Sequence, residues 1–395
     1  MTVSDDVLAN DPASLSIEQL AAEMIAVGCR RVHVLAWRDL DDIDAGGSEV
    51  HADHFMRRWA AAGLDITHRT SFAIGQPAVS ERNGYRVVRK GSRYTVFPRA
   101  VARELASSRD YDALVEVWNG VPWLSPLWCR KPRITFLHHV HGPMWDQILP
   151  GPLAFIGRGI EAHLAPPFYR RTLTLTPSDA TRDELLHLGF KANRVVAINN
   201  GVDEIFQPGG LRAPVPTITS VGRLAPVKRQ DRLIDEAVVA KRRVPDLQLV
   251  IVGEGPLRQV VEQRIADYGA SGWITLTGKL SQDELVALYQ RSWLVTSASL
   301  AEGWGLTLTE AAGCGTPAVA TDINGHRSSV IDGVTGVLSP LERLGDTIAD
   351  VLHDDARREQ LAVGALARAR TLTWDASARG ILHALHGEAL RKARA

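Results

Sequence analysis

The chain has 395 residues, which is too long for one hydrophobic core and predicts two domains. Apolar residues make up 45% and charged residues 23%, as in an ordinary soluble globular enzyme. The 45 Lys and Arg residues balance the 45 Asp and Glu residues, so no global charge would attract nucleic acid or an acidic membrane.

The cysteines and the N-terminus indicate a cytoplasmic protein. Cys29, Cys129 and Cys314 are odd in number and lack metal-ligand spacing, so reduced thiols are the simplest interpretation. The first residues are acidic and polar, unlike a signal peptide. No uninterrupted apolar run of about 18 residues, the length that spans a bilayer, is present.

The chain begins with a stretch, residues 1–15, that is typical of a loose arm. Ser16 and Gln19 then form a capping-box pattern, which predicts a helix ending near Gly28. Residues 32–36 are apolar and predict the first buried strand.

An acidic run follows at residues 39–44. It resembles a metal-binding patch, but no further cluster of ligands accompanies it. A solvated loop is therefore the favoured interpretation.

Gly46, Gly47 and Ser48 open a predicted helix whose Phe55 and Trp59 fall on one face. A strand, a glycine pair and a helix can bring backbone N–H groups against a phosphate. The unit is not a Walker loop, because the Gly-Lys-Ser/Thr ending is absent.

Later apolar runs predict strands that alternate with helices, which indicates parallel sheets covered by helices. Turn residues at 199–210 mark the hinge, so we expect an N-terminal domain at 1–206 and a C-terminal domain at 207–376. The last helix, 377–395, is expected to pack back on the first domain. Two such α/β domains predict a ligand cleft between them. The expected strands are 112–118, 134–137, 173–176, 195–198, 217–221, 247–252, 273–277, 293–297 and 318–321.

Three histidines, His138, His139 and His141, close one predicted strand and would point toward that cleft. A zinc site would need a third or fourth ligand at a telling spacing, and none is present. One histidine acting in acceptor binding is favoured, with satisfied loop histidines as the alternative for the other two.

The segment from 143 to 169 is poor in charge and rich in large apolar side chains. It could make weak peripheral contact with a lipid interface or line an apolar acceptor pocket. Helices packed in the core are the slightly favoured alternative.

Arg223 and Lys228 follow the first strand of the second domain. Two cations on such a loop can hold a diphosphate, the arginine through its planar fork and the lysine as a point charge. A solvated loop is the alternative. The Gly253-Glu254-Gly255-Pro256 turn after the next strand is a weak candidate for bordering a nucleobase.

The central motif runs from Glu302 to Glu310. Gly303 and Gly305 end an apolar strand, and the Ala-rich stretch from Leu306 predicts a helix whose N-terminus can hold an anion. Carboxylates repel phosphate but accept hydrogen bonds from sugar hydroxyls. The pattern indicates a phosphorylated sugar, against the alternative of an ordinary strand–turn–helix unit with surface glutamates.

Taken together, these motifs resemble retaining glycosyltransferases of the GT-B fold, specifically glycosyltransferase family four. The resemblance covers about residues 31 to 380, and its combination of motifs in this order is highly specific. The markers are Ala45 to Glu49, Asn200 to Asp203, Gly222 to Leu224 with Lys228, Gly253 to Pro256, Glu302 to Glu310 in the family's Glu-x7-Glu pattern, and Asp332 to Gly336.

The resemblance implies two Rossmann-like, doubly wound α/β domains and a role for each motif. Glu302 would bind donor-sugar hydroxyls and Glu310 the ribose hydroxyls. Arg223 and Lys228 would hold the diphosphate, helped by the glycine turns and backbone N–H groups. His138 would lie beside the transferred sugar, with His139 as the runner-up. The backbone contributors are Gly46, Gly47, Gly305, Leu306 and Thr307.

The sequence also departs from the family pattern at two places. Trp304 stands where relatives often carry Phe, and Asn324 to Ser328 replace the usual Gly-Gly-x-Pro-Glu. The second change concerns the donor end of the site, so the resemblance leaves the identity of the sugar open.

The implied reaction is transfer from a nucleotide diphosphate sugar, with UDP favoured, to give an α-linkage. Neither a metal nor another cofactor is expected. The acceptor class stays open between a small molecule, a glycan and a lipid-linked sugar, and the sequence does not indicate an oligomeric state. The competing classes are a nucleotide-sugar epimerase or a sugar phosphorylase of the same fold, a glycoside hydrolase, and a non-catalytic sugar-nucleotide binder.

Overall fold

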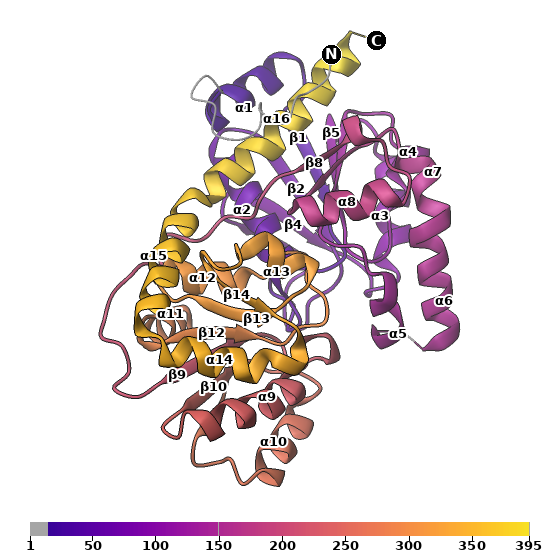
Figure 1. Ribbon diagram of the computed structural model, residues 1–395. Helices are drawn as coiled ribbons and strands as arrows, with labels where there is room; N and C mark the ends of the chain where they lie inside the picture. Colours follow the sequence, from indigo (N-terminus) through magenta and orange to yellow (C-terminus); the bar gives the residue numbers. More distant parts are fainter. Residues whose placement is uncertain (1–14, 149, 395) are drawn as a thin grey trace. The chain divides into compact units, whose positions relative to one another are not determined.

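The computed structural model describes residues 15–148 and 150–394, and it divides the chain into two compact units (Figure 1). The chain passes from the N-terminal unit to the C-terminal unit after Gly201 and returns to the N-terminal unit at Trp374. Most of the loose arm predicted at 1–15 lies outside the described residues. Both units are α/β sandwiches, so the predicted fold class is confirmed.

The N-terminal unit is built on an eight-stranded sheet with the order β3-β4-β2-β1-β5-β6-β7-β8. Its pairs are parallel except for the antiparallel β3–β4 hairpin. Three of its strands, β2, β3 and β4, were not predicted, because charged residues interrupt their apolar pattern. The strands are β1 (Arg31–Leu35), β2 (Asp65–Thr70), β3 (Val79–Arg82), β4 (Tyr85–Arg89), β5 (Ala113–Trp118), β6 (Arg133–Leu137), β7 (Leu173–Thr176) and β8 (Val195–Ala197).

Helices cover both faces of this sheet. On one face, α1, α2 and α16 share a single apolar core with the strands, and α16 runs along α1 and α2 (Figure 1). Smaller clusters under α3, α7 and α8 fill the other face. The helical elements are α1 (Ile17–Ala26), α2 (Gly47–Ala61), α3 (Val96–Ala106), α4 (Ser125–Trp128), η2 (Gly142–Met144), α5 (Trp145–Ile148), α6 (Gly151–Gly159), η3 (Ile160–Leu164), α7 (Ala165–Tyr169), α8 (Asp179–His187), η4 (Ala192–Arg194) and α16 (Trp374–Ala393).

The C-terminal unit has a six-stranded parallel sheet with the order β11-β10-β9-β12-β13-β14. Its two faces pack against α9 and α14 on one side and α11 and α12 on the other. The strands are β9 (Thr217–Val221), β10 (Gln248–Val252), β11 (Ile274–Gly278), β12 (Leu294–Ser297), β13 (Ala318–Thr321) and β14 (Gly336–Ser339). The helical elements are η5 (Pro226–Lys228), α9 (Gln230–Arg243), α10 (Arg258–Asp267), α11 (Gln282–Arg291), α12 (Leu306–Gly313), α13 (Asn324–Ser329), η6 (Leu341–Arg343), α14 (Leu344–His353) and α15 (Asp355–Thr371).

Local predictions at the start of the chain are confirmed. Ser16 caps α1, its hydroxyl accepts from the backbone N–H of Gln19, and the Gln19 side chain accepts from the N–H of Ser16. All three cysteines are buried and unpaired. Within the described ranges, no helix is both long enough and apolar enough to cross a membrane.

Candidate functional site

A glycine turn joins β12 to α12 in the C-terminal unit. Gly305 is the N-cap residue and has a φ of 97°, a conformation that L side chains rarely adopt. A Cβ at this position would also lie 3.2 Å from Ser329 Oγ. Leu306 and Thr307 follow in the first turn, where helical N–H groups have no intrahelical acceptor. The turn therefore presents amide hydrogens and a positive helix end to an anion.

A carboxylate and an ammonium group meet beside this turn. Lys228 Nζ donates to Glu302 Oε1 at 2.5 Å, and Ser299 Oγ donates to the same oxygen at 2.8 Å. Lys228 ends η5, and the backbone N–H of Leu300 donates to Val227 O at 2.8 Å. The loops that follow β9 and β12 are thus held together, which places two motifs separated by about seventy residues in direct contact.

Glu302 is ionised in this environment. Burial raises the pKa of its carboxyl, but the positive charge of Lys228, the influence of His326 and the two side-chain hydrogen bonds together lower that pKa below its ordinary value. An ionised carboxylate can accept hydrogen bonds from sugar hydroxyls. The side chains of Lys228 and Glu302 remain 26% and 15% exposed, so a ligand can reach both.

Arg223 lies on the same loop as Lys228, just after β9, and it is exposed. The neighbouring turn from Gly253 to Pro256 has a structural explanation. A Cβ on Gly253 would stand 2.0 Å from Gly222 O, and one on Gly255 would stand 2.4 Å from Leu224 O. These glycines allow the loops after β9 and β10 to pack backbone against backbone.

The carboxyl of Glu310, on α12, has a raised pKa. The Tyr289 hydroxyl donates to Glu310 Oε2 at 3.2 Å. Burial is the largest influence and, with the negative charge of Asp203, raises the pKa of Glu310 to about 7 despite that hydrogen bond. Sequence reasoning missed this property, because neither Tyr289 nor Asp203 is close to Glu310 in sequence.

The departure from the family pattern at residues 324–328 folds as the short helix α13 beside Glu302. A Cβ on Gly325 would lie 2.2 Å from Glu302 O, so only glycine allows this approach. The ring of His326 is fully buried, and its Nδ1 donates to Thr321 O at 2.7 Å. His326 therefore stands directly behind the Glu302 and Gly305 turn, a neighbour that the sequence pattern did not reveal.

In the N-terminal unit, His138 follows β6 and lies against α2. Its Nε2 is 3.3 Å from His51 Nδ1, and it is only 6% exposed. Burial lowers the pKa of both rings, that of His51 to about 3, so both imidazoles are neutral near pH 7. His51 was missed by sequence reasoning. Another α2 residue, His54, stacks on Trp374 with ring centroids 4.1 Å apart.

The other two histidines of the cluster belong to a different set of contacts. His141 stacks on Trp145, and its backbone N–H donates to Glu161 Oε1 at 2.8 Å. His139 stacks on His141. The backbone of the loop after β6 is thus braced by Glu161, which also accepts from the N–H of Gly142 at 2.8 Å.

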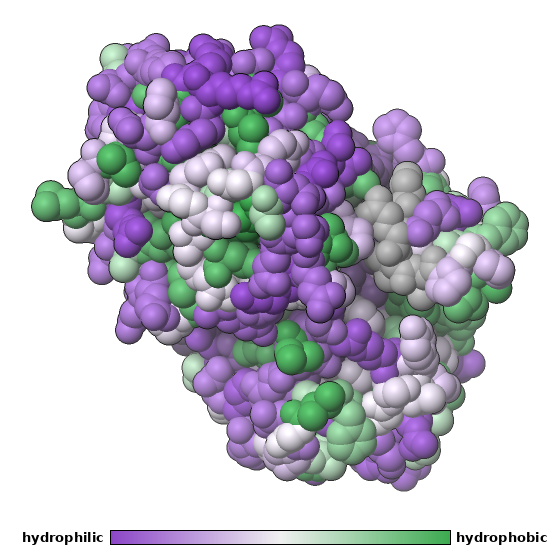
Figure 2. Space-filling view, turned by 90° about the horizontal axis from the view of Figure 1, so that it is seen from below, coloured by the Kyte–Doolittle hydropathy of each residue, from purple (hydrophilic) through white to green (hydrophobic). Residues whose placement is uncertain are grey.

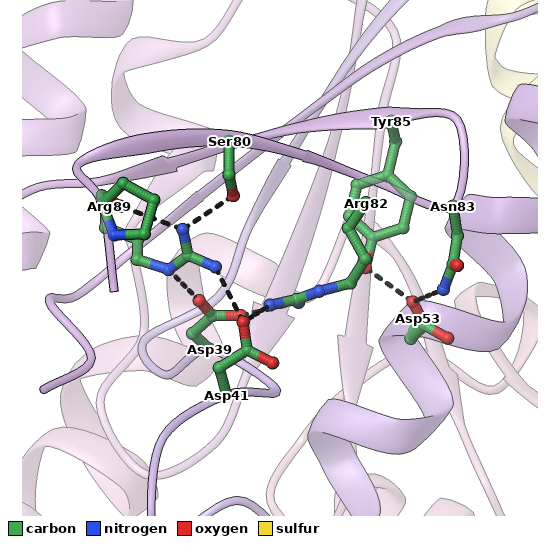
Figure 3. A network of polar contacts seen from close by, with 9 residues as sticks. Asp39, Asp41, Asp53, Ser80, Arg82, Asn83, Tyr85 and Arg89 are labelled. Atoms are coloured by element: carbon green, nitrogen blue, oxygen red, sulfur yellow. Dashed lines mark hydrogen bonds and ion pairs between the residues drawn. The ribbon is translucent and has the colours of Figure 1, made fainter. Parts of the chain in front are cut away.

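The prediction of a solvated loop at 39–44 is wrong for Asp39, whereas Asp41 and Ile43 are exposed. Asp39 is fully buried, pairs with Arg82 at 2.7 Å and also contacts Arg89, and Asp41 joins both arginines (Figure 3). The arginines come from β3 and β4, which the sequence did not predict.

This network anchors the loop that leads to the predicted phosphate-binding turn. Gly46 caps α2, and its backbone N–H donates to Glu49 Oε2 at 2.8 Å. Arg38 lies 3.3 Å from the other oxygen of Glu49. Gly47 therefore begins a firmly placed helix, and the same helix carries His51 against His138.

The segment 143–169 is only partly a packed core, so the favoured interpretation is wrong for several side chains. Ala154, Ala165 and Tyr169 are buried. Figure 2 shows hydrophobic atoms among polar ones at the right-hand edge, where α6 lies in Figure 1. The exposed apolar side chains of this segment are Leu153, Phe155, Ile156, Leu164 and Phe168.

The structure thus brings the predicted residues together in two groups, one in each unit. Lys228, Glu302 and the Gly305 turn form one group, with Glu310 on the helix that the turn begins. Gly47 and His138 belong to the other, joined through His51. Over residues 15–148 and 150–394, no set of three or more His, Cys, Asp and Glu side chains is arranged to hold a metal ion.

Comparison with known proteins adds independent findings. Residues 201–368 match the family described as "Glycosyl transferases group 1", and residues 45–205 match "Glycosyltransferase Family 4". The D-inositol 3-phosphate glycosyltransferase of Mycobacteroides abscessus is 30% identical over 397 residues, covering 89% of this chain and 86% of that protein. The protein of the same name from Frankia alni is 35% identical, but the match spans 51% of this chain and 56% of that protein.

A solved structure shows the same fold. Anabaena HepE, in complex with UDP and glucose, has a TM-score of 0.72 at 18% identity, covering 91% of this chain and 100% of that one.

Proposed function

Because the chain belongs to glycosyltransferase family 4, a family of retaining enzymes that use nucleotide sugars, we propose that it transfers a hexosyl group from a UDP-sugar to an acceptor hydroxyl with an α-linkage. One observation carries this proposal most directly. The ionised Glu302, the ammonium of Lys228 and the amide-bearing turn at Gly305 lie together in one unit.

Each part of this group suits one part of a donor. The first amides of α12 and the cations Arg223 and Lys228 would hold the diphosphate, whose oxygens accept charged hydrogen bonds. Glu302 would accept from hydroxyls of the donor sugar. Glu310 would accept from the ribose hydroxyls, since a carboxylate is a natural acceptor for a diol. UDP is the first candidate because the solved relative HepE holds UDP.

The reaction would proceed on one face of the sugar. The bond between the anomeric carbon and the diphosphate oxygen breaks, and the acceptor oxygen bonds to the same carbon from the same side. The acceptor proton passes to the departing diphosphate, so no enzyme nucleophile is needed. Stabilising the negative charge on that leaving group would be the main contribution of Arg223, Lys228 and the α12 amides.

His138 would contribute from the N-terminal unit. Its ring is neutral, and its contact with His51 fixes its orientation. A neutral imidazole can donate one hydrogen bond and accept another, so it can bind a hydroxyl of the transferred sugar without adding charge. Gly46 and Gly47 would place the first amides of α2 near the phosphates.

D-inositol 3-phosphate is the first acceptor to examine, because a relative that matches most of this chain carries that substrate in its name. The decisive experiment incubates the protein with UDP-, GDP- and TDP-sugars, each with and without candidate acceptors, and identifies products by mass spectrometry. We expect a glycosylated acceptor and free UDP, and the anomeric proton coupling of the product to show an α-linkage.

Two controls separate the competing functions, and a third tests whether a metal is needed. Donor alone should give only slow hydrolysis, whereas an epimerase would interconvert it. Inorganic phosphate should not replace the acceptor, as it would for a phosphorylase. Added EDTA should leave turnover intact, because the cations and the helix end take the place of a metal. If the protein binds the donor but turns over none of the acceptors in the panel, it is a non-catalytic sugar-nucleotide binder.

A further inference from the structure

A basic cavity lies in the N-terminal unit away from the groups described above. Its volume is about 290 Å³, and its walls come from the loop between α4 and β6, the loop between α7 and β7, and the C-terminal end of α16. The lining side chains include six cations and one carboxylate: Arg130, Lys131, Arg133, Arg171, Arg391, Lys392 and Glu388.

The position of this cavity separates it from the candidate catalytic groups. β6 and β7 are parallel neighbours, so their amino ends lie at one edge of the sheet and their carboxyl ends at the other. The cavity borders Arg133, where β6 begins, and His138 follows the end of that strand. A strand of this length spans about 17 Å at 3.3 Å per residue. The cavity is therefore a different site on the same sheet.

Both oxygens of the single carboxylate in the cavity wall already accept hydrogen bonds from arginines. Glu388 Oε1 accepts from Arg194 at 2.7 Å, and Glu388 Oε2 accepts from Arg391 at 2.5 Å. The positive charge of Lys131 helps to lower the pKa of Asp112, but that carboxyl already pairs with Arg31 at 2.7 Å. The cavity thus keeps a surplus of positive charge, and like charges that share one concave site repel unless an anion joins them.

Two residues of the walls each have a buried polar atom without a hydrogen-bond partner in the described ranges. The hydroxyl of Thr172, a residue only 4% exposed, has no hydrogen-bond partner within residues 15–148 and 150–394. Arg133 donates from Nη1 to Cys129 O at 2.7 Å, while its buried Nε has no acceptor in the same ranges. Buried donors without acceptors are costly, so a ligand oxygen that either donor reached after a small side-chain shift would stabilise that donor.

We propose that this cavity binds a phosphate group carried by a small molecule or a lipid. Guanidinium forks match the oxygens of phosphate, and a threonine hydroxyl supplies a further donor. Two sources share this chemistry. A soluble phosphate ester would enter from solvent, whereas a lipid headgroup would also bring acyl chains toward Leu127 on α4 and Phe168 on α7, which are both exposed.

The test measures binding to the full-length protein by isothermal titration at low salt. The probes are glycerol 3-phosphate and inorganic pyrophosphate, and cosedimentation uses vesicles of phosphatidylcholine with and without phosphatidic acid. The pocket variant is Arg171→Ala/Lys392→Ala, whose two positions are exposed and can be changed without opening the core. The matched control is Arg170→Ala/Lys191→Ala, which removes two exposed cations outside the cavity.

We expect the pocket variant to weaken binding by more than about tenfold, since a hydrogen bond to a charged group contributes about 1.5–3 kcal/mol, while the control variant binds like wild type. Pocket-dependent binding of the soluble probes identifies a free phosphate ester, and pocket-dependent binding of phosphatidic acid vesicles alone identifies a lipid. Equal binding by the wild type and the pocket variant in both assays overturns the proposal.

One further variant keeps this test independent of the proposed donor site. Lys228→Ala should leave pocket-dependent phosphate binding unchanged, because Lys228 belongs to the C-terminal unit and does not line the cavity. Loss of all phosphate binding in Lys228→Ala would assign the signal to the donor site and contradict a second site.

Discussion

The two units each contain an ion pair beside a loop, and the two pairs differ in how far they are exposed to solvent. In the N-terminal unit, the Asp39 and Arg89 side chains are 0% and 1% exposed and share their charges with Asp41 and Arg82 (Figure 3). In the C-terminal unit, Lys228 and Glu302 are 26% and 15% exposed and meet through one short contact. The Asp39 loop follows β1, which is the first strand of the N-terminal sheet in chain order. The Lys228 loop follows β9, the first strand of the C-terminal sheet in chain order, and the Glu302 loop packs against it.

The difference lies in whether a ligand can replace the partner. A buried pair is closed to solvent, and removing one member leaves the other charged and without a partner. A part-exposed pair can exchange its contact for a phosphate or a hydroxyl at little cost. The first network therefore positions the chain, whereas the second is accessible to a ligand.

Breaking the buried network should have the largest effect. Arg89→Met removes one of the two arginines that pair with the buried Asp39, together with the hydrogen bonds from Arg89 to Pro77 O and Ser80 Oγ. We therefore expect the free energy of unfolding to fall by about 3–5 kcal/mol. Urea titration measures this loss. Arg86→Ala, an exposed position on the same strand, is the control and should change stability little. A loss below about 1 kcal/mol for Arg89→Met would contradict a positioning role.

Removing Lys228 should act on turnover rather than on folding. Losing one group that stabilises a leaving charge typically costs about 10²–10³ in kcat, and we expect this for Lys228→Ala. Stopped assays with the donor and acceptor that the product screen identifies measure this loss. Lys279→Ala, an exposed lysine of the same unit, serves as control. Near-wild-type turnover of Lys228→Ala would remove the assignment of the diphosphate to this lysine.

The pKa of Glu310 predicts how donor binding changes with pH. Near pH 7 this carboxyl is half protonated, and its protonated form is a weaker acceptor for a diol because one of its oxygens carries the proton. We therefore expect KM for the donor to rise about tenfold as the pH falls from 8 to 6, because the ionised fraction falls about that much below a pKa of 7. Glu310→Gln should raise KM and flatten this profile.

The same shift predicts a stability effect without donor. The folded pKa lies above the ordinary value of 4.5, so the folded state binds the proton more tightly than the unfolded state. The stabilisation is complete below about pH 4.5 and is lost as the pH rises through about 7. Thermal unfolding of the wild type and of Glu310→Gln between these pH values measures it. Parallel curves would show that Glu310 titrates normally.

Removing Ser299 should have the smallest effect. Its hydroxyl supports Glu302 Oε1, but Lys228 contacts the same oxygen. We expect Ser299→Ala to lower kcat/KM only a few-fold, in line with about 1 kcal/mol for one hydrogen bond. Ser328→Ala, whose hydroxyl donates to Asn324 O, is a control that spares Glu302. A loss as large as that of Lys228→Ala would mean that Ser299 orients Glu302 by itself.

Much of the architecture follows from local patterns in the sequence. Short apolar runs alternate with amphipathic stretches, and they predicted β1, β5 to β13 and the α/β class. The Ser16 capping box and the left-handed glycine at 305 are also local, because each depends on residues within one turn of the chain. A local sequence pattern can predict a helix cap, because the residues that form the cap are neighbours in any fold that contains the helix.

Contacts between distant segments escaped prediction for the opposite reason. Strands β3 and β4 look too polar for a sheet until Asp39 and Asp41 neutralise Arg82 and Arg89, and the Arg69 charge of β2 pairs with Glu104. The pairing of His51 with His138 and the raised pKa of Glu310 likewise depend on groups brought together only by folding.

The amino-acid sequence by itself determined the fold class, the family and the types of residue that can bind a phosphorylated sugar. Only the tertiary structure decided that Lys228 pairs with Glu302, that Asp39 is buried, and that cations from three distant segments line one cavity. Desolvation and charge pairing act through space, so residue order alone does not reveal them.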